Sequence, residues 1–370
     1  MEIEFKDEFK RILDSAINQD ASDIHLTVGI PPTFRINGEL YQQKDFEVNT
    51  PKITEDFMKQ LLSEEHLEKF NKNKELDTSM SYGGKRFRIH TFKQSGADAA
   101  VLRLIPSVIP NFKEMGVPPI VKKFTTLHNG LVLITGVTGS GKSTTLASLI
   151  NEINMNYSKH IVTVEDPIEY VHTHKNSIIN QREVGTDVKD FPSAVRAAMR
   201  EDPDVLLVGE MRDLETIQNA ITMAETGHLV FATLHTKSAA ESIGRIVDIF
   251  PPEQQTQIRT QLASSLKGVI SQELLPKIGG GRVPSCEIMI VNDAIRAYIR
   301  ENTNTNSIVD QIQMNSKELK SQTRLQSLAR LVIEKKIEIS TARRGLTDKD
   351  IMTLNSIIMT ESTSRNRDYD

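Results

Sequence analysis

A glycine-rich stretch at residues 136–143, Gly-Val-Thr-Gly-Ser-Gly-Lys-Ser, constrains the fold of this chain more than any other feature. The apolar residues 131–134 before it predict a buried strand, and residues 144–150 after it predict the first turns of a helix. Glycines let the backbone curl so that several N–H groups point toward one anion, and a helix N-terminus adds partial positive charge. The sequence therefore predicts a strand–loop–helix unit that binds phosphate.

The polar side chains of this loop have separate expected roles. Lys142 is expected to reach the β- and γ-phosphates of ATP, and the Ser143 hydroxyl is expected to hold Mg²⁺. A plain glycine–serine turn is the alternative, and the Lys-Ser pair at this offset argues against it. The other residues expected to surround the phosphates are Gly136, Val137, Thr138, Gly139, Ser140, Gly141 and Thr144.

Composition excludes several classes of protein. The formal net charge of −4 argues against a general nucleic-acid binder, which would carry a basic excess. A single cysteine, Cys286, excludes a disulfide within the chain and a zinc site with several cysteines. No apolar run approaches the roughly 18–20 residues of a membrane span, and the N-terminus does not read as a signal peptide. We therefore expect a cytoplasmic protein without a membrane-inserted segment.

The length of 370 residues is enough for two domains with separate cores. Prolines at 106, 110, 118 and 119 predict a linker with few bending modes. The expected parts, in chain order, are a small α+β domain (1–105), the proline-rich linker (106–118), an α/β core with a mostly parallel sheet (119–292), a helical region (293–358) and a disordered polar tail (359–370).

Local patterns predict the elements of the first part in more detail. Helical periodicity and apolar or alternating runs distinguish helices from strands. Helices are expected over 5–19, 53–62 and 65–72, strands over 22–28, 85–92 and 99–105, and a hairpin turn at Asn37-Gly38. A further helix is expected over 117–126, just before the phosphate-binding unit.

Two more apolar runs end in carboxylates. Residues 161–164 precede Glu165, with Asp166 and Glu169 close behind, and residues 205–208 precede Glu210. Ligands collect at the carboxyl ends of strands in parallel sheets, so these acids are expected near the phosphates. They suit Mg²⁺ binding or activation of water, and Glu165 and Glu210 are the expected metal-binding acids. A solvated acidic turn is the alternative for the first group.

Two histidines, His228 and His235, bracket the predicted strand at 229–234. Both are expected to sense the γ-phosphate by hydrogen bonding. They are not expected to bind a metal, because no third ligand at suitable spacing accompanies them.

Phosphoryl transfer also requires positive charge on the γ-phosphate oxygens. Arg86 and Arg88 stand two residues apart and therefore share one face of a predicted strand. For each arginine, an ordinary surface ion pair is the alternative. The full candidate set is Arg86, Arg88, Arg103, Arg196 and Arg200.

The motifs, taken in order, resemble those of the secretion-type ATPases of type IV pili and type II secretion. The matching segments are the N-terminal signature at 21–26, the Walker A motif at 136–143, the Asp box at 164–169, the Walker B segment at 200–213 and the His box at 226–236. The resemblance covers about residues 5–350.

This resemblance implies a PAS-like N-terminal domain followed by a RecA-like P-loop ATPase domain with a helical C-terminal part. It also implies a hexameric ring that hydrolyses ATP with Mg²⁺, in which arginines of the N-terminal domain complete the site. Glu169 is then the expected water-activating base and Glu210 the Walker B acid, and these two roles are open to exchange. The implied partner is the platform protein of the pilus machine at the cytoplasmic face of the inner membrane.

Within the family, the chain resembles the retraction members, which drive pilin disassembly and twitching motility. It begins at the PAS-like domain and lacks the four-cysteine element of assembly ATPases. Residues 294–301 resemble the C-terminal stretch that retraction requires, with departures at Ala297 and Tyr298, and Ser95 stands where the family has arginine. An accessory retraction ATPase and an assembly or type II secretion ATPase are the alternatives. From other classes, we consider a nucleic-acid translocase and a nucleotide-gated binding module.

Overall fold

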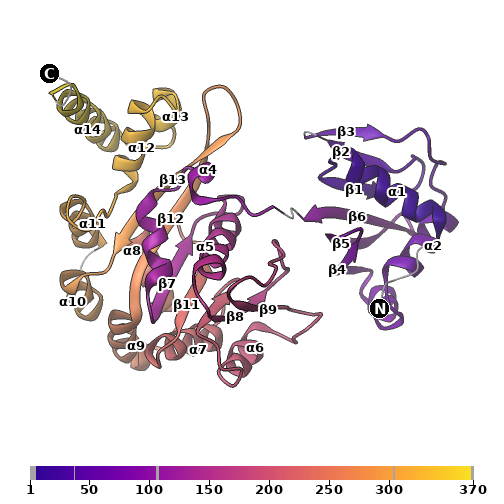
Figure 1. Cartoon of the computed structure of the whole chain (residues 1–370), viewed down its shortest axis with the longest axis horizontal. Helices are drawn as coiled ribbons and strands as arrows, with labels where there is room; N and C mark the ends of the chain where they lie inside the picture. Colours follow the sequence, from indigo (N-terminus) through magenta and orange to yellow (C-terminus); the bar gives the residue numbers. More distant parts are fainter. Residues whose placement is uncertain (1–5, 37, 106–107, 303–304, 368–370) are drawn as a thin grey trace. The chain divides into compact units, whose positions relative to one another are not determined.

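The computed structural model describes residues 6–36, 38–105, 108–302 and 305–367 (Figure 1). The chain divides into two compact units. One comprises the residues up to Val108 together with 167–171, and the other comprises 109–166 and the residues from His172 onward. Each unit has hydrophobic cores of its own.

The first unit is built on a six-stranded sheet in which every described pairing is antiparallel, with the order β3-β2-β1-β6-β5-β4. Its strands are β1 (Asp23–Leu26), β2 (Thr33–Ile36), β3 (Glu39–Gln42), β4 (Glu75–Tyr82), β5 (Lys85–Gln94) and β6 (Ala97–Ile105). Its helices are α1 (Asp7–Asn18), α2 (Pro51–Leu61) and α3 (Glu64–Asn73).

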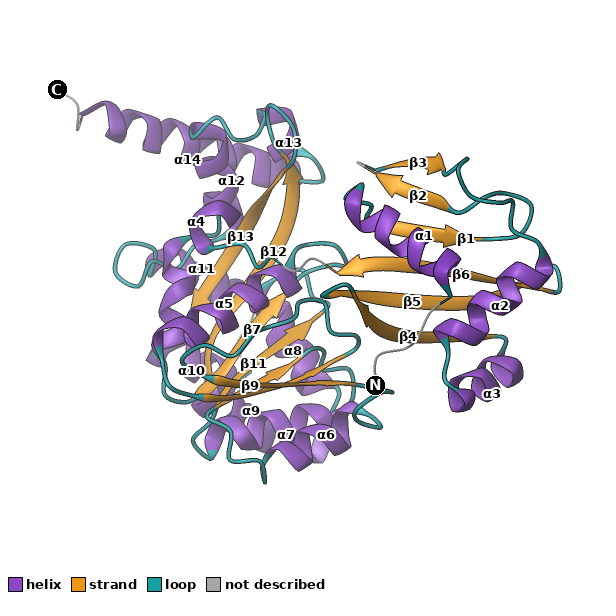
Figure 2. Ribbon diagram, turned by 45° about the vertical axis from the view of Figure 1, so that its right-hand side comes forward, coloured by secondary structure: helices purple, strands orange, loops and turns teal. Residues whose placement is uncertain are grey.

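Amphipathic helices close the core of this unit. Helix α1 buries Phe9, Ile12, Leu13 and Ala16, which the spacing of three and four residues places on one face. The Thr50 side chain caps α2, and Ser63 caps α3 in the same way. Helices α1 and α2 lie in front of the sheet in Figure 2, and their aromatic residues share a core with the alternate residues of β5.

The second unit contains a seven-stranded sheet of order β13-β12-β7-β11-β10-β8-β9, parallel except for the β12–β13 hairpin. Every residue of β7, β10 and β11 is buried, as expected for central strands covered on both faces. The strands are β7 (Gly130–Thr135), β8 (His160–Glu165), β9 (Ile178–Glu183), β10 (Val205–Val208), β11 (Leu229–Leu234), β12 (Leu266–Pro276) and β13 (Arg282–Ile290).

Helices cover both faces of this sheet, and separate core clusters mark the two sides. One cluster joins the sheet to α4 (Phe112–Met115), the 3₁₀ helix η1 (Pro119–Thr126) and α5 (Lys142–Asn156). The other joins it to α6 (Phe191–Ala198), α7 (Leu214–Glu225), α8 (Ala239–Asp248), α9 (Pro252–Ser265), α10 (Asp293–Glu301) and α11 (Thr305–Met314). A smaller cluster holds α12 (Arg324–Ile333), α13 (Ile339–Arg343) and α14 (Asp348–Arg367).

The expected linker over 106–118 is partly structured. Residues 112–115 form α4, and Val117 is buried in the same cluster as α5. The Ser148 hydroxyl of α5 donates to the Pro110 carbonyl oxygen at 2.6 Å. The prolines predicted a lack of regular structure. Apolar residues between them, such as Phe112, Met115 and Val117, pack against the core and order part of the segment. Residues 106–107 and Asn37 of the predicted hairpin turn lie outside the described residues.

The expected disordered tail is helical as far as Arg367, because α14 runs without a break across residue 359. A polar sequence predicts that a segment lacks packing partners, whereas extending an existing helix requires only bonds to the preceding turn. Strands β4 and β9 and the β12–β13 hairpin were not predicted, and residues 119–126 form a 3₁₀ helix within the helix expected over 117–126.

Candidate active site

The loop at residues 136–143 joins the end of β7 to the start of α5. Gly136 has φ +144°, and a Cβ there would stand 2.2 Å from the carbonyl oxygen of Gln272. Gly141 caps α5 in the left-handed conformation, with φ +89°. Glycine is therefore required at both points by backbone geometry and by the close approach of β12. The 15-residue helix α5 begins directly at the end of this loop, where its first-turn N–H groups suit an anion.

Lys142 is buried at the first residue of α5. Its Nζ atom donates to the carbonyl oxygens of Gly136 at 2.8 Å and Val137 at 3.1 Å. These bonds hold the ammonium group over the first residues of the loop, where it suits binding of phosphate oxygens. Ser143 and Thr144 follow in the first helical turn and are half-buried. The Ser143 hydroxyl fits Mg²⁺, which is usually bound by one or two protein oxygens together with phosphates.

Gln272 on β12 fixes the loop from the neighbouring strand, and it is not among the residues predicted from the sequence. Its Nε2 atom donates to the Ser140 carbonyl oxygen at 2.8 Å, and its Oε1 atom accepts from the Thr145 hydroxyl at 2.8 Å. The side chain is buried and uses both ends of its amide. The one available signal was the polar run Ser271-Gln272-Glu273, which interrupts an apolar stretch, because the sequence does not show that β12 lies beside β7.

The carboxyl ends of four parallel strands bring several predicted residues to one edge of the sheet. The order β7-β11-β10-β8 places the loop, His235, Glu210 and Glu165 on successive strands. The Nε2 atom of His235 lies 3.2 Å from Glu210 Oε1, and Arg212 Nε lies 2.5 Å from the same oxygen. The Glu210 carboxylate raises the pKa of Arg212 through this hydrogen bond and its charge. Glu210 is thus oriented from two sides.

Glu165 lies outside the His235–Glu210 cluster, and its assignment as a Mg²⁺ ligand stays a prediction. Strand β8 is three positions from β7, which corresponds to about 14 Å at about 4.8 Å per strand. Glu165 is therefore better placed for hydrogen bonding on β8 than for direct binding of an ion at the loop, because ligands stand about 2 Å from Mg²⁺. Its Oε1 atom accepts instead from Thr163 Oγ1 at 2.6 Å and Gln181 Nε2 at 3.1 Å.

Glu169 lies in the segment 166–171 that follows β8, and it is exposed. Its place after β8 agrees with the expectation that ligands collect at the carboxyl ends of strands. The assignment of Glu169 as the base stays a prediction.

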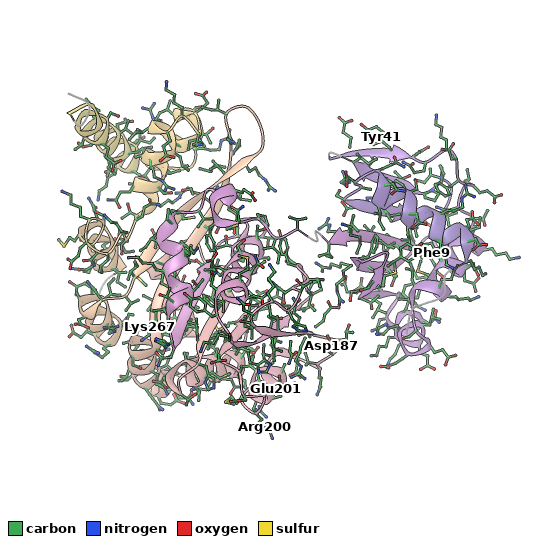
Figure 3. The ribbon with its side chains drawn as sticks, viewed as in Figure 1. Phe9, Tyr41, Asp187, Arg200, Glu201 and Lys267 are labelled. Carbon is green, nitrogen blue, oxygen red and sulfur yellow. The ribbon has the colours of Figure 1, made fainter. Side chains whose placement is uncertain are left out.

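His228 and Arg200 lie at the edge of the sheet opposite the phosphate loop, so neither stands beside the loop of the same subunit, and their roles at a nucleotide stay predictions. His228 precedes β11, and its carbonyl oxygen accepts from Gly130 N–H at the start of β7. Its Nδ1 atom lies 3.0 Å from the Met223 carbonyl oxygen, where it closes the end of α7. Arg200 precedes β10 and is exposed at the lower margin of the second unit (Figure 3). The sequence pattern at 228–235 predicted a strand, but it did not determine which end of that strand lies beside the phosphate loop.

Three predicted arginines share one face of the sheet in the first unit, the face turned away from α1 and α2. Arg88 lies directly opposite Arg103 on the adjacent strand. Arg103 forms an ion pair with Asp23 at 2.7 Å, and Arg86 donates to the Ser79 hydroxyl at 2.7 Å. Arg103 thus forms the surface ion pair that was its alternative, Arg86 bonds a neutral hydroxyl, and the role of these arginines at a phosphate stays a prediction. Arg196, the fifth candidate, pairs with Glu215.

A cavity of about 340 Å³ adjoins the loop within the second unit. Burial raises the pKa of the Glu287 carboxyl there, and its Oε1 atom accepts from Ala239 N–H at the start of α8. Arg324 of α12 pairs with Glu273 of β12 at 2.9 Å. The cavity wall thus joins the starts of α8 and α12 to the strands beside the loop. Its lining includes Gly136, Val137, Lys237, Ser271, Gln272, Glu273, Ser285, Glu287, Arg324 and Gly345.

Neither a cluster of metal-ligating side chains nor a membrane-spanning helix occurs among the described residues. They contain no group of three or more His, Cys, Asp or Glu side chains placed to hold a metal ion. None of their helices has the length and apolar character needed to span a membrane. Burial raises the pKa of the Cys286 thiol to about 12, so this cysteine is a packing residue.

A parallel sheet with a glycine-rich phosphate loop after one strand, and a histidine and an acid after the next two, defines a RecA-like P-loop ATPase. The family model described as Type II/IV secretion system protein matches residues 4–280. The chain belongs to this family of secretion ATPases, as its motifs predicted.

Its relatives include retraction ATPases. The type IV pilus retractation ATPase PilT of Pseudomonas aeruginosa is 48% identical over 295 residues, which cover 78% of this chain and 84% of that protein. A twitching motility protein of Neisseria gonorrhoeae is 44% identical over 330 residues, covering 87% and 86%. The crystal structure of the pilus retraction motor PilT with bound ADP has a TM-score of 0.86 at 50% identity, covering 93% of this chain and 98% of that one. The predicted resemblance to the retraction members is confirmed.

Proposed function

We propose that this protein is an ATP-hydrolysing motor that drives retraction of type IV pili, and hence twitching motility. The observation that carries the proposal is the contact of Glu210 with His235 beside the phosphate loop, in a chain nearly half identical to a retraction ATPase. An acid fixed at this edge gives the phosphate-binding loop the means for hydrolysis, which a simple nucleotide switch does not require.

In the proposed mechanism, the N–H groups of the loop and the Lys142 ammonium bind the β- and γ-phosphates of ATP. The Ser143 hydroxyl would hold Mg²⁺, and Glu210 would contact the water shell of that ion. Bound Mg²⁺ neutralises charge on the phosphate oxygens. His235 touches Glu210 and is placed to report whether a γ-phosphate is present.

Hydrolysis requires a base and additional positive charge. Water attacks the γ-phosphorus, the bond to the β-phosphate oxygen breaks, and Glu169 or Glu210 takes the proton of the water. Arginines of the first unit, Arg86, Arg88 and Arg103, would stabilise the developing charge. Loss of the γ-phosphate changes which contacts are available, so the states bound to ATP and to ADP differ in free energy and can drive domain motion.

We further propose a homo-hexameric ring in which several subunits contribute to each site. The ring would act on the platform protein of the pilus machine at the cytoplasmic face of the inner membrane. Neither nucleic-acid binding nor membrane insertion is part of the proposal.

The test combines enzymology with a deletion strain. The purified protein should release phosphate from ATP, and Lys142→Ala should lower turnover by on the order of 10²–10³-fold, because the phosphates lose their main cationic ligand. Exposed Lys44→Ala is the matched control and should keep wild-type turnover. Cells lacking the protein should carry excess pili and lose surface motility, and only Lys44→Ala should restore motility.

Other outcomes would identify the alternatives. Cells without pili would support an assembly or secretion ATPase, and retained but weaker retraction would support an accessory role. Stimulation of turnover by DNA would support a nucleic-acid translocase. Binding of ATP without phosphate release, or wild-type turnover in Lys142→Ala, would refute the proposed motor.

A further inference from the structure

The segment 166–171, which carries Glu169, follows β8 and precedes the return of the chain to β9. Strands β8 and β9 are parallel neighbours (Figure 1). Thr163 lies directly opposite Gln181 in this pair. Because side chains alternate along a strand, Thr163, Glu165 and Gln181 lie on the same face of the sheet.

A single side chain connects the two ends of this segment. Gln181 Nε2 donates to Glu165 Oε1 at 3.1 Å, and Glu165 is the last residue of β8. Gln181 Oε1 accepts from the backbone N–H of His172 at 2.7 Å, just after the segment. Thr163 Oγ1 donates to the same Glu165 oxygen at 2.6 Å and fixes the carboxylate. The residue before the segment, Glu165, and the residue after it, His172, are therefore both hydrogen-bonded to the side-chain amide of Gln181.

The chemistry of the side chains fits this arrangement. A carboxylate only accepts hydrogen bonds, and a backbone N–H only donates one. A residue joining them must therefore donate at one end and accept at the other, which the glutamine amide does. The His172 ring is partly buried, and burial lowers its pKa to about 4. The residue whose backbone N–H bonds Gln181 therefore carries a neutral ring at neutral pH.

We propose that Gln181, together with Glu165, positions the segment 166–171 and so sets the placement of Glu169 for hydrolysis. This inference rests on the proposed function, in which Glu169 activates water. Glu165 becomes a positioning residue instead of a metal ligand. A misplacement of about 1 Å at a reacting group can cost on the order of 10²-fold in rate, so a local tether can control turnover without touching ATP.

The first test replaces Gln181 with methionine, which keeps similar volume but lacks the amide. We expect kcat to fall by about 10–100-fold, while KM for ATP and the affinity for ADP change by less than about twofold. Gln257→Met, at an exposed position on α9, is the matched control and should behave as wild type. A purely structural role would instead lower the melting temperature and the affinity for ADP together.

The second test exchanges the two partners. Gln181→Glu places two carboxylates together and should lower kcat. Adding Glu165→Gln should restore it, because the amide now at position 165 can donate to the introduced carboxylate, which still accepts from His172 N–H. Glu165→Gln alone keeps an accepting oxygen and should show the Mg²⁺ dependence of the wild type. A rise of about tenfold or more in the Mg²⁺ requirement of Glu165→Gln, with normal kcat in Gln181→Met, would overturn the proposal.

A third measurement does not depend on turnover. Hydrogen–deuterium exchange should be faster at the His172 amide and across 166–171 in Gln181→Met. It should have the wild-type rate in the double variant that carries Gln181→Glu and Glu165→Gln. Unchanged exchange in Gln181→Met would refute the tether even if the protein hydrolyses ATP. Faster exchange in a protein without ATPase activity would retain the tether and refute the proposed function, so the two failures are distinguishable.

Discussion

The two edges of the seven-stranded sheet carry similar residues with different surroundings. At the carboxyl edge, His235 and Glu210 contact each other beside the phosphate loop. At the amino edge, His228 closes the end of α7, and Asp204 binds Lys159 and the His160 N–H. Histidine and acid thus occur at both ends of the same two strands. Strand direction, and not residue type, decides which pair can reach a nucleotide.

The strongest test of this comparison replaces acids at both ends of β10. Glu210→Gln should lower kcat by about 10²–10³-fold with little change in ADP affinity, because the neutral amide binds the Mg²⁺ water shell and a transferred proton poorly. Asp204→Asn is the matched control and should keep kcat within about twofold while lowering stability by about 1 kcal/mol. Phosphate release and ADP titration measure both. Similar losses of kcat would erase the distinction between the edges.

A smaller effect is expected from the two histidines. His235→Asn should lower kcat by about 10–30-fold, because Glu210 loses an orienting contact. His228→Asn removes a bond to the Met223 carbonyl oxygen, so it should lower the melting temperature with a change in kcat below about twofold. Turnover and thermal unfolding distinguish the outcomes. A large kcat loss in His228→Asn would mean that the amino edge reaches a nucleotide, for example that of a neighbouring subunit.

Local order along the chain was predictable, and the order of strands across the sheet was not. The phosphate loop, α5 and the acids after β8 and β10 followed from apolar runs and their next residues, which depend on neighbours in sequence. The expectation for His228 treated both ends of β11 as equivalent, although the loop lies at one of them. Parallel strand direction determines which end faces the loop, and that direction is a property of the assembled sheet.

The same limit explains Gln272 and Glu165. Strand β12 lies beside β7 although more than a hundred residues separate Gln272 from the loop it binds. Glu165 was assigned because it ends a predicted strand of the parallel sheet, whereas three strand positions separate β8 from β7. Pairing between distant segments depends on packing of the whole sheet, which no local pattern contains.

Gln272 offers a prediction of intermediate size at the carboxyl edge. Gln272→Met should raise KM for ATP and weaken ADP binding by about 5–10-fold, because two bonds that shape the loop are lost. The effect on kcat should be smaller, since the acids keep their places. Thr145→Val removes one of the same bonds, so the double variant should lose less affinity than the two single changes predict together. Additive losses would indicate that Gln272 does not act through Thr145.

The smallest predicted effect concerns acid stability of the segment after β8. Burial lowers the pKa of His172 to about 4, below its ordinary value of 6.5. Between these two pH values the unfolded chain binds a proton at His172 and the native protein does not. The contribution of the neutral His172 ring to the free energy of unfolding is fully present above about pH 6.5 and is lost as the pH falls toward 4. Between pH 7 and pH 6 it amounts to about 0.7 kcal/mol.

Urea unfolding of wild type and His172→Gln at both pH values measures this contribution as a difference, in which other titrating groups cancel. The variant should lose about 0.7 kcal/mol less stability than the wild type on acidification. Equal losses of unfolding free energy in the two proteins would mean that the His172 ring is solvated. The end of the segment 166–171 would then be held by the bond between Gln181 and the His172 backbone, without a contribution from the ring.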